Sequence, residues 1–405
     1  MPSTLPDADP APISGDLPAD AVATVGQTPL SIYLHVPFCR TRCGYCDFNT
    51  YTASELGDAP GASRAGYADS AIAELELARR VLGPDAPPVS TVFVGGGTPT
   101  LLPADDLGRM LAAARELFGL TADAEVTTES NPDSIGPAGL ERLVQHGFTR
   151  ISFGMQSVRP HVLAVLDREH TPGRAQQAVA DAQRAGFAHT SLDLIYGTPG
   201  ETLADWEASL TAALAAGPDH VSAYSLIIEQ GTRLAARVRR GELPAPDEDD
   251  LADKYELAEE LLSAAGFVNY EISNWASTEA ARCRHNLAYW RGHNWWGIGP
   301  GAHSHVGGIR WWNVKHPAAY AGRLDQGRSP AHARESLDPQ TRRVERVLLE
   351  LRLDSGLDRT ILTAREQSRI PDLRARGMIT DNDDQLVLTP AGRLLADGIV
   401  RELLD

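Results

Sequence analysis

Short apolar, β-branched runs alternate with longer amphipathic stretches along the first part of the chain. The apolar runs predict six strands, at residues 31–35, 91–94, 125–129, 150–154, 189–194 and 220–226. The amphipathic stretches between them predict helices, at residues 67–81, 107–118, 175–185 and 205–215. Strands separated by helices indicate right-handed crossovers and a parallel sheet. Six such units fit an α/β fold, a partial (β/α)6 barrel, in which active sites assemble at the carboxyl ends of the strands.

The pattern changes on both sides of this predicted barrel, which spans residues 30–266. Residues 1–29 are rich in proline and aspartate and predict a disordered acidic tail. Residues 267–335 are an extension rich in aromatic residues and glycine that ends in a linker, and five of the seven tryptophans fall between Trp290 and Trp312 within it. Residues 336–405 predict helices, a short hairpin and a last helix, typical of a winged-helix-like domain. With 11 basic and 13 acidic side chains, this block favours a structural or docking role over DNA binding.

Composition limits the possible partners and compartments. The chain has 405 residues, of which 42% are hydrophobic, and a net charge of −17, which argues against a nucleic-acid surface. No run of 18 apolar residues occurs, so no integral membrane segment is expected. The first basic residue is Arg40, so neither a secretory signal nor a mitochondrial transit peptide fits. Few, grouped cysteines suit a reducing compartment, and we expect a cytoplasmic protein.

Three of the four cysteines, Cys39, Cys43 and Cys46, follow the first predicted strand at CxxxCxxC spacing. They offer three thiolates, whereas iron–sulfur clusters are normally held by four. A cubane held by three thiolates leaves one iron open to a small molecule, so the spacing indicates chemistry and not only structure. A zinc knuckle with His35 as a fourth ligand is the alternative, although zinc sites usually use CxxC pairs.

This spacing, with Tyr45 before the last cysteine, resembles the radical S-adenosylmethionine (SAM) superfamily. The resemblance implies a [4Fe–4S] cluster on the three cysteines, whose open iron is chelated by the amino and carboxylate groups of SAM. A glycine-rich turn, Gly95-Gly96-Gly97-Thr98, follows the second predicted strand. Glycine lets the backbone approach a ligand closely. In this context the turn resembles the superfamily motif that hydrogen-bonds the SAM amino group.

Polar residues stand at or shortly after the later predicted strands, namely Glu129, Gln156, Arg168 and Asp193. Each alone is more often a turn or capping group, but together they predict a binding site on the barrel rim. The motifs narrow the resemblance to the oxygen-independent coproporphyrinogen III oxidase family, including its HemW-type haem chaperone branch, over residues 30–400. By that resemblance, the positions that contact SAM are Tyr33, Gly96, Gly97, Thr98, Glu129, Gln156, Arg168 and Asp193.

Two features distinguish the branches of this family. Oxidases carry a further cysteine two positions after the third ligand, where this chain has Phe48. The run from His285 to Trp290 matches the HNxxYW motif that is associated with haem binding in the chaperone branch. The match implies His285 as an axial haem ligand, beside the flat apolar faces of Tyr289 and Trp290. A structural role for this histidine is the alternative, and further candidate ligands nearby are His293, His303 and His305. Cys283 is interpreted as a free thiol.

The favoured function is a haem chaperone that binds a [4Fe–4S] cluster, SAM and haem and delivers haem to an unidentified acceptor protein. The competing hypothesis is an oxygen-independent coproporphyrinogen III oxidase, which decarboxylates two propionates of a porphyrinogen by radical chemistry. A winged-helix DNA-binding sensor is a third, remote hypothesis because the last block is nearly neutral. No nucleic-acid partner is expected.

Overall fold

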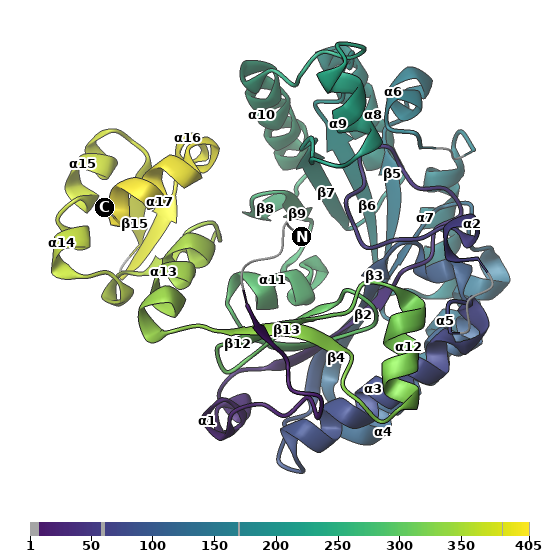
Figure 1. Cartoon of the computed structure of the whole chain (residues 1–405). Coiled ribbons are helices and arrows are strands. Elements are labelled where there is room, and N and C mark those ends of the chain that lie inside the picture. Colours follow the sequence, from purple (N-terminus) through teal and green to yellow (C-terminus); the bar gives the residue numbers. More distant parts are fainter. Residues whose placement is uncertain (1–7, 58–60, 169–170, 383, 405) are drawn as a thin grey trace.

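Six parallel strands form the centre of the computed structural model, which describes residues 8–57, 61–168, 171–382 and 384–404. They lie side by side in chain order and pair in parallel, each with the next (Figure 1). The strands are β2 (Leu30–Val36), β3 (Val89–Gly96), β4 (Leu120–Ser130), β5 (Arg150–Gln156), β6 (His189–Tyr196) and β7 (His220–Ser225). The six predicted strands and the predicted α/β architecture are confirmed.

Helices connect these strands and pack against one another on the outside of the sheet (Figure 1). The long ones are α3 (Tyr67–Leu82), α4 (Ala104–Phe118), α5 (Pro137–His146), α7 (Arg174–Ala185), α8 (Leu203–Ala215) and α10 (Glu248–Ala264). Short helices in the loops are α2 (Ala53–Leu56), α6 (Pro160–Val165) and α9 (Arg233–Arg239). Among the described helices, none combines the length and the apolar character that crossing a bilayer requires.

Side chains alternate between two environments along each parallel strand. On β5, Phe153 is buried in the main hydrophobic core, whereas Ser152 lines an interior cavity. On β6, Leu192 belongs to the same core and Asp193 lines the same cavity. Successive side chains of a strand point to opposite faces. The apolar half of each strand therefore packs against the surrounding helices, and the polar half forms the lumen of the barrel.

The segment before β2 is folded, which differs from the disordered tail predicted for residues 1–29. β1 (Asp9–Pro10) pairs with β13 (Ala331–Ser336), and α1 (Ala19–Ala23) follows it. Ala21 and Val25 are each 3% exposed and belong to the main core. These apolar residues are buried because the segment packs against elements that are distant in the sequence, such as β13. Residues 1–7 lie outside the described part of the chain.

Residues 267–335, predicted as an extension with a linker, lengthen the same sheet at both edges. On one side β10 (Asn294–Ile298) pairs in parallel with β2 and continues into β11 (His303–Val306), β12 (Ile309–Asn313) and β13. On the other side β9 (Asn274–Ala276) pairs with β7 and with β8 (Val268–Glu271). The short helix α11 (Arg284–Trp290) lies between these edges in the sequence, and α12 (Pro317–Asp325) packs on α3.

The last block has its own hydrophobic core, which includes Val347, Leu373 and Leu403. It is mainly helical and poor in strands: α13 (Pro339–Glu350), β14 (Leu357–Asp358), α14 (Ala364–Gln367), α15 (Ile370–Ala375), β15 (Ile379–Asn382), β16 (Gln385–Leu388), α16 (Pro390–Leu394) and α17 (Ala396–Leu404). The order of helices and hairpin agrees with the prediction. The Arg282 guanidinium ties this block to the sheet extension through both carboxylate oxygens of Asp354, at 3.1 and 2.7 Å.

Candidate functional site

A cavity of about 1410 Å³ opens at the carboxyl ends of the parallel strands and reaches down into the lumen. Eleven of the thirteen residues predicted from the sequence line it, and they come from five of the six strand ends or the loops after them. They are Cys39, Cys43, Tyr45, Cys46, Gly96, Gly97, Thr98, Glu129, Gln156, Arg168 and Asp193. Tyr33 and His285 are the other two, and they lie behind the cavity wall.

The loop with the three cysteines is held by backbone hydrogen bonds on both of its sides. Gly44 donates its N–H to Leu166 O and accepts from the N–H of Leu234, both at 2.9 Å. All three thiols are free and partly exposed to the cavity. Burial, together with the neighbouring Cys46 and Cys43, raises the pKa of Cys39 to about 11. Thiolates that raise one another's pKa need a cationic centre to hold them ionised, which fits the donor set of an iron–sulfur cluster.

A single zinc ion fits this loop poorly. His35, the possible fourth ligand, is buried, and both of its ring nitrogens are engaged: Nδ1 with the Tyr33 hydroxyl and Nε2 with Asn49 O, each at 2.9 Å. Within the described ranges, no three His, Cys, Asp or Glu side chains converge closely enough to hold one metal ion. A cluster distributes its thiolates over several irons, so it does not need them to converge on one point.

The glycine-rich turn lies directly against the cysteine loop. Gly97 donates its N–H to Val36 O, and Thr98 donates to Phe38 O, both at 2.8 Å. A Cβ on Gly97 would lie 2.5 Å from Phe38 O and 3.0 Å from Cys39 Sγ. Only glycine allows this approach, because the first distance is shorter than any normal contact. The two predicted motifs are therefore parts of one wall of the cavity.

Two half-buried carboxyl groups, Glu129 and Asp193, line the same cavity. Glu129 Oε2 accepts a hydrogen bond from the Gly96 N–H at 3.0 Å. Burial, and then the negative charge of Asp193, raises the pKa of Glu129 to about 8. Burial also raises the pKa of Asp193, although the Ser152 hydroxyl lies 2.8 and 2.9 Å from its two oxygens. Carboxyl groups of this kind can accept from the hydroxyls of a ribose.

Gln156 and Arg168 present buried polar atoms that lack partners among the described residues. Gln156 ends β5 with a φ of 63°, rare for a residue with a side chain, and its Oε1 has no hydrogen-bond partner. Arg168 donates from Nη2 to Gly154 O at 3.1 Å, and its Nη1 lies 3.6 Å from Cys43 Sγ, while Nε has no partner. Buried polar groups are normally satisfied, so this wall fits a ligand with polar groups, such as SAM.

The structure adds lining residues at the floor of the cavity that the sequence analysis did not assign. Arg150 and His220 are 1% and 2% exposed, and both line the cavity with Cys283. His220 is held by the Ser191 hydroxyl and the Tyr270 hydroxyl, both at 2.8 Å. The alternation of side chains along β5 and β7 could have identified both residues. Arg150 and His220 each stand two positions before a residue that lines the cavity, Ser152 and Ser222, so they point to the same face of the sheet.

His285 and Tyr33 do not reach the cavity. His285 is 1% exposed, and its Nδ1 and Nε2 lie 2.7 Å from the Thr91 hydroxyl and 2.9 Å from the Tyr289 hydroxyl. Burial lowers the pKa of His285 to about 3, so the ring stays neutral. Axial ligation of haem by His285 would require one of these bonds to break, and the assignment stays a prediction. Tyr33 uses its hydroxyl on His35, so its contact with SAM also stays a prediction.

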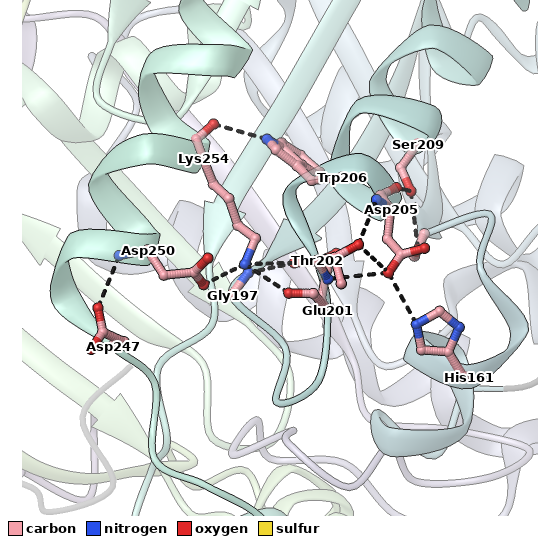
Figure 2. Close-up of polar contacts among 11 residues, drawn as sticks. His161, Gly197, Glu201, Thr202, Asp205, Trp206, Ser209, Asp247, Asp250 and Lys254 are labelled. Carbon is pink, nitrogen blue, oxygen red and sulfur yellow. Dashed lines mark hydrogen bonds and ion pairs between the residues drawn. The ribbon is translucent and has the colours of Figure 1, made fainter.

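A buried lysine supports the loop that follows β6 and Asp193. Figure 2 shows Lys254 of α10 reaching toward Glu201, which lies in the turn between Gly197 and α8. The Lys254 Nζ donates to Glu201 O at 3.0 Å and also pairs with the Asp250 carboxylate. Glu201 Oε2 accepts from the Gly197 N–H at 2.7 Å. The side chains of Lys254 and Glu201 are both fully buried, so this contact fixes the turn next to the cavity.

Comparisons with known proteins agree with this arrangement. A sequence profile of the Radical SAM superfamily matches residues 33–213. A protein of Mycobacterium tuberculosis named "Heme chaperone HemW" is 54% identical over 376 residues, which cover 93% of this chain and 95% of the relative. The chain belongs to the HemW family of the radical SAM superfamily. Superfamily membership implies a [4Fe–4S] cluster and SAM, and the wall described above fits both.

Further relatives extend the likeness over nearly the whole chain. The Bacillus subtilis protein of the same name is 31% identical and covers 91% of this chain and 97% of the relative. Among solved structures, coproporphyrinogen III oxidase (HemN) from Escherichia coli, a radical SAM enzyme, matches with a TM-score of 0.79 at 25% identity. That match covers 95% of this chain and 92% of the other. The fold is therefore shared with the oxidase, C-terminal block included.

The Glu129→Gln substitution is expected to change how stability depends on pH. The pKa of Glu129 is about 8 in the folded protein, above its ordinary value of 4.5. Between these two values the unfolded chain loses a proton that the folded chain keeps, so the carboxyl costs folding stability as pH rises, by up to about 1.4 kcal/mol per pH unit. Glutamine cannot ionise. We expect the variant to be more stable than the wild type, and this difference in the free energy of unfolding should grow by about 1–2 kcal/mol as the pH rises from 6 to 8.

Urea unfolding of both proteins without added ligand, at several pH values in this range, measures the effect. A difference in the free energy of unfolding that stays constant with pH would show that Glu129 is ionised in the folded protein throughout the range.

Proposed function

We propose that this protein is a haem chaperone that holds a [4Fe–4S] cluster on Cys39, Cys43 and Cys46, binds SAM beside it, binds haem and passes it to an acceptor protein. The observation that carries the proposal is one cavity wall formed by the cysteine loop and the glycine turn, in a chain 54% identical to a protein named as a haem chaperone. A bound cluster and SAM would supply reductive cleavage of the SAM sulfonium. The protein residues position these groups.

The lumen supports the SAM part of the proposal. The Gly96–Thr98 turn brings backbone groups to the cysteine loop, where the amino group of SAM would bind. The Glu129 carboxyl would accept from the ribose hydroxyls, and Arg168 would offer a cation for a carboxylate. Gln156 contributes its unpartnered Oε1. All four positions line one cavity.

The oxidase hypothesis is the second candidate, because the fold matches the Escherichia coli oxidase over 95% of this chain. One pair of assays separates the two. Anaerobically reconstituted protein is mixed with coproporphyrinogen III, SAM and a reductant, and protoporphyrinogen formation is followed. In parallel, haemin is titrated into the same protein and followed by absorbance.

We expect stoichiometric haem binding and no decarboxylation. Protoporphyrinogen formation at a steady rate would replace the chaperone proposal by the oxidase. The absence of any haem binding would also overturn it. Repeating the titration with His285→Ala tests the predicted axial ligand, since loss of that ligand would move the absorbance bands of bound haem.

A further inference from the structure

The mouth of the cavity carries three large apolar side chains that are open to solvent. Ile227 is 66% exposed, Phe48 50% and Tyr224 43%, and all three line the cavity. They are three of the nine large apolar side chains exposed among the described residues. Scattered exposed apolar residues are ordinary, but a group around the opening of a ligand cavity marks an interaction site.

Neighbouring contacts direct two of these side chains, Ile227 and Tyr224. Leu226, next to Ile227, donates its N–H to Tyr196 O at 2.8 Å and buries its side chain in an apolar cluster with Ile195 and Leu234. Ile227 is therefore directed away from that cluster. Burial of the hydroxyl raises the pKa of Tyr224. The exposed part of Tyr224 is consequently its ring.

The cavity is larger than one cofactor requires. Small-molecule sites usually measure about 300–1,000 Å³, and this cavity measures about 1410 Å³. The predicted SAM contacts lie on the wall next to the cysteines, so space remains between that wall and the mouth. A second ligand of considerable size fits there.

Charges on the rim indicate what such a ligand carries. Arg40 lines the cavity, is exposed and makes no hydrogen bond or ion pair with any described residue. Arg233 also lines it, with its Nη2 donating to Arg42 O at 2.6 Å and lying 3.5 Å from Asp167. Asp47 and Glu229 stand on the same rim. Of the two rim arginines, Arg40 is thus the one left unpaired for an anionic group of a ligand.

We propose that the mouth, formed by Phe48, Tyr224 and Ile227, is the haem-docking site, with a propionate directed toward Arg40. This inference rests on the proposed function and assigns the place where the tetrapyrrole binds. A flat apolar ring with carboxylates at its edge matches apolar side chains beside an unpaired guanidinium. The site is separate from His285, whose two ring nitrogens are engaged behind the cavity wall.

The test is a haemin titration of anaerobically reconstituted full-length protein, followed at the Soret band. The variants are Phe48→Ala, Ile227→Ala and Arg40→Ala, with Ile13→Ala as the matched control. Ile13 is 68% exposed, against 66% for Ile227, and does not line the cavity. Each apolar substitution is expected to weaken haem affinity about tenfold, because it removes part of a buried contact. Arg40→Ala is expected to weaken it about threefold, with a smaller salt dependence. The Ile13 control should bind like the wild type.

Two further measurements make the result decisive. Iron content and SAM binding of each variant should equal those of the wild type, because the substituted side chains are exposed and are not cluster ligands. Phe48→Trp should bind haem with the affinity of the wild type, unlike Phe48→Ala, since tryptophan keeps a flat ring at this position. Wild-type binding together with unchanged affinity in Phe48→Ala and Ile227→Ala would overturn this inference and leave the proposed function standing. A wild type that binds no haem would overturn both.

Discussion

Replacing Cys43 by alanine is expected to abolish the cluster. The wild type, reconstituted with iron and sulfide under anaerobic conditions, should hold about four irons per chain and show brown charge-transfer absorbance. The variant should hold close to none. Three thiolates are the minimum donor set for a cubane with one open iron, and the loop offers no substitute: His35 is buried with both nitrogens hydrogen-bonded.

The matched control is Cys283→Ala, which changes the one other cysteine of the chain. Cys283 lies at the floor of the cavity, and its Sγ is 3.7 Å from a Glu125 carboxylate oxygen. Burial raises the pKa of Cys283 well above that of an ordinary thiol, so this side chain stays protonated and is a poor iron ligand. Cys283→Ala should therefore keep its iron. Equal iron content in both variants would contradict the assignment of the cysteine loop as the cluster site.

Much of the site could be predicted because local patterns in the sequence determine it. The β-branched runs located the strands, and the carboxyl ends of parallel strands meet at one edge. Glu129 and Asp193 were found in this way, although they are 64 positions apart, and they share one cavity. The cysteine spacing and the glycine-rich turn could also be identified from the sequence. The structure adds the contact between them, at Gly97.

What could not be predicted depends on partners distant in the sequence. Ala21 and Val25 look like part of a disordered tail until the far edge of the sheet gives them a place to pack. Arg150 stands at the start of a strand, where parity gives its face of the sheet, but its place in one cavity with Cys283 depends on residues far away in the sequence. His285 stands in a motif that predicts a haem ligand, yet its two ring nitrogens are hydrogen-bonded to the hydroxyls of Thr91 and Tyr289. No local signal distinguishes a ligand from a histidine satisfied by such contacts.

Replacing Lys254 by alanine is expected to destabilise the barrel by about 3–5 kcal/mol, the usual cost of removing one partner of a buried charged pair. The substitution leaves Glu201 O without its donor and Glu201 Oε2 without a cation 3.9 Å away. It also leaves a void, because the Lys254 side chain is fully buried. Lys315→Ala, at the only other lysine of the chain, is the control. Lys315 is exposed, so its change should stay within about 0.5 kcal/mol.

The pH dependence separates the charge from the void in the Lys254→Ala variant. Burial raises the pKa of Glu201 to about 7, and the charge of Lys254 opposes that rise. Without Lys254 the pKa of Glu201 rises further. The wild type stops losing stability once the pH passes the pKa of Glu201, at about 7, whereas the variant continues to lose stability above that pH. Urea unfolding should therefore show a larger difference at about pH 8 than at about pH 6, and Lys254→Met, which fills the void, should keep this trend. Since the same turn follows β6, the strand that carries Asp193, SAM affinity should fall in both variants. A destabilisation that methionine fully rescues at every pH would mean that Lys254 acts here by its volume alone.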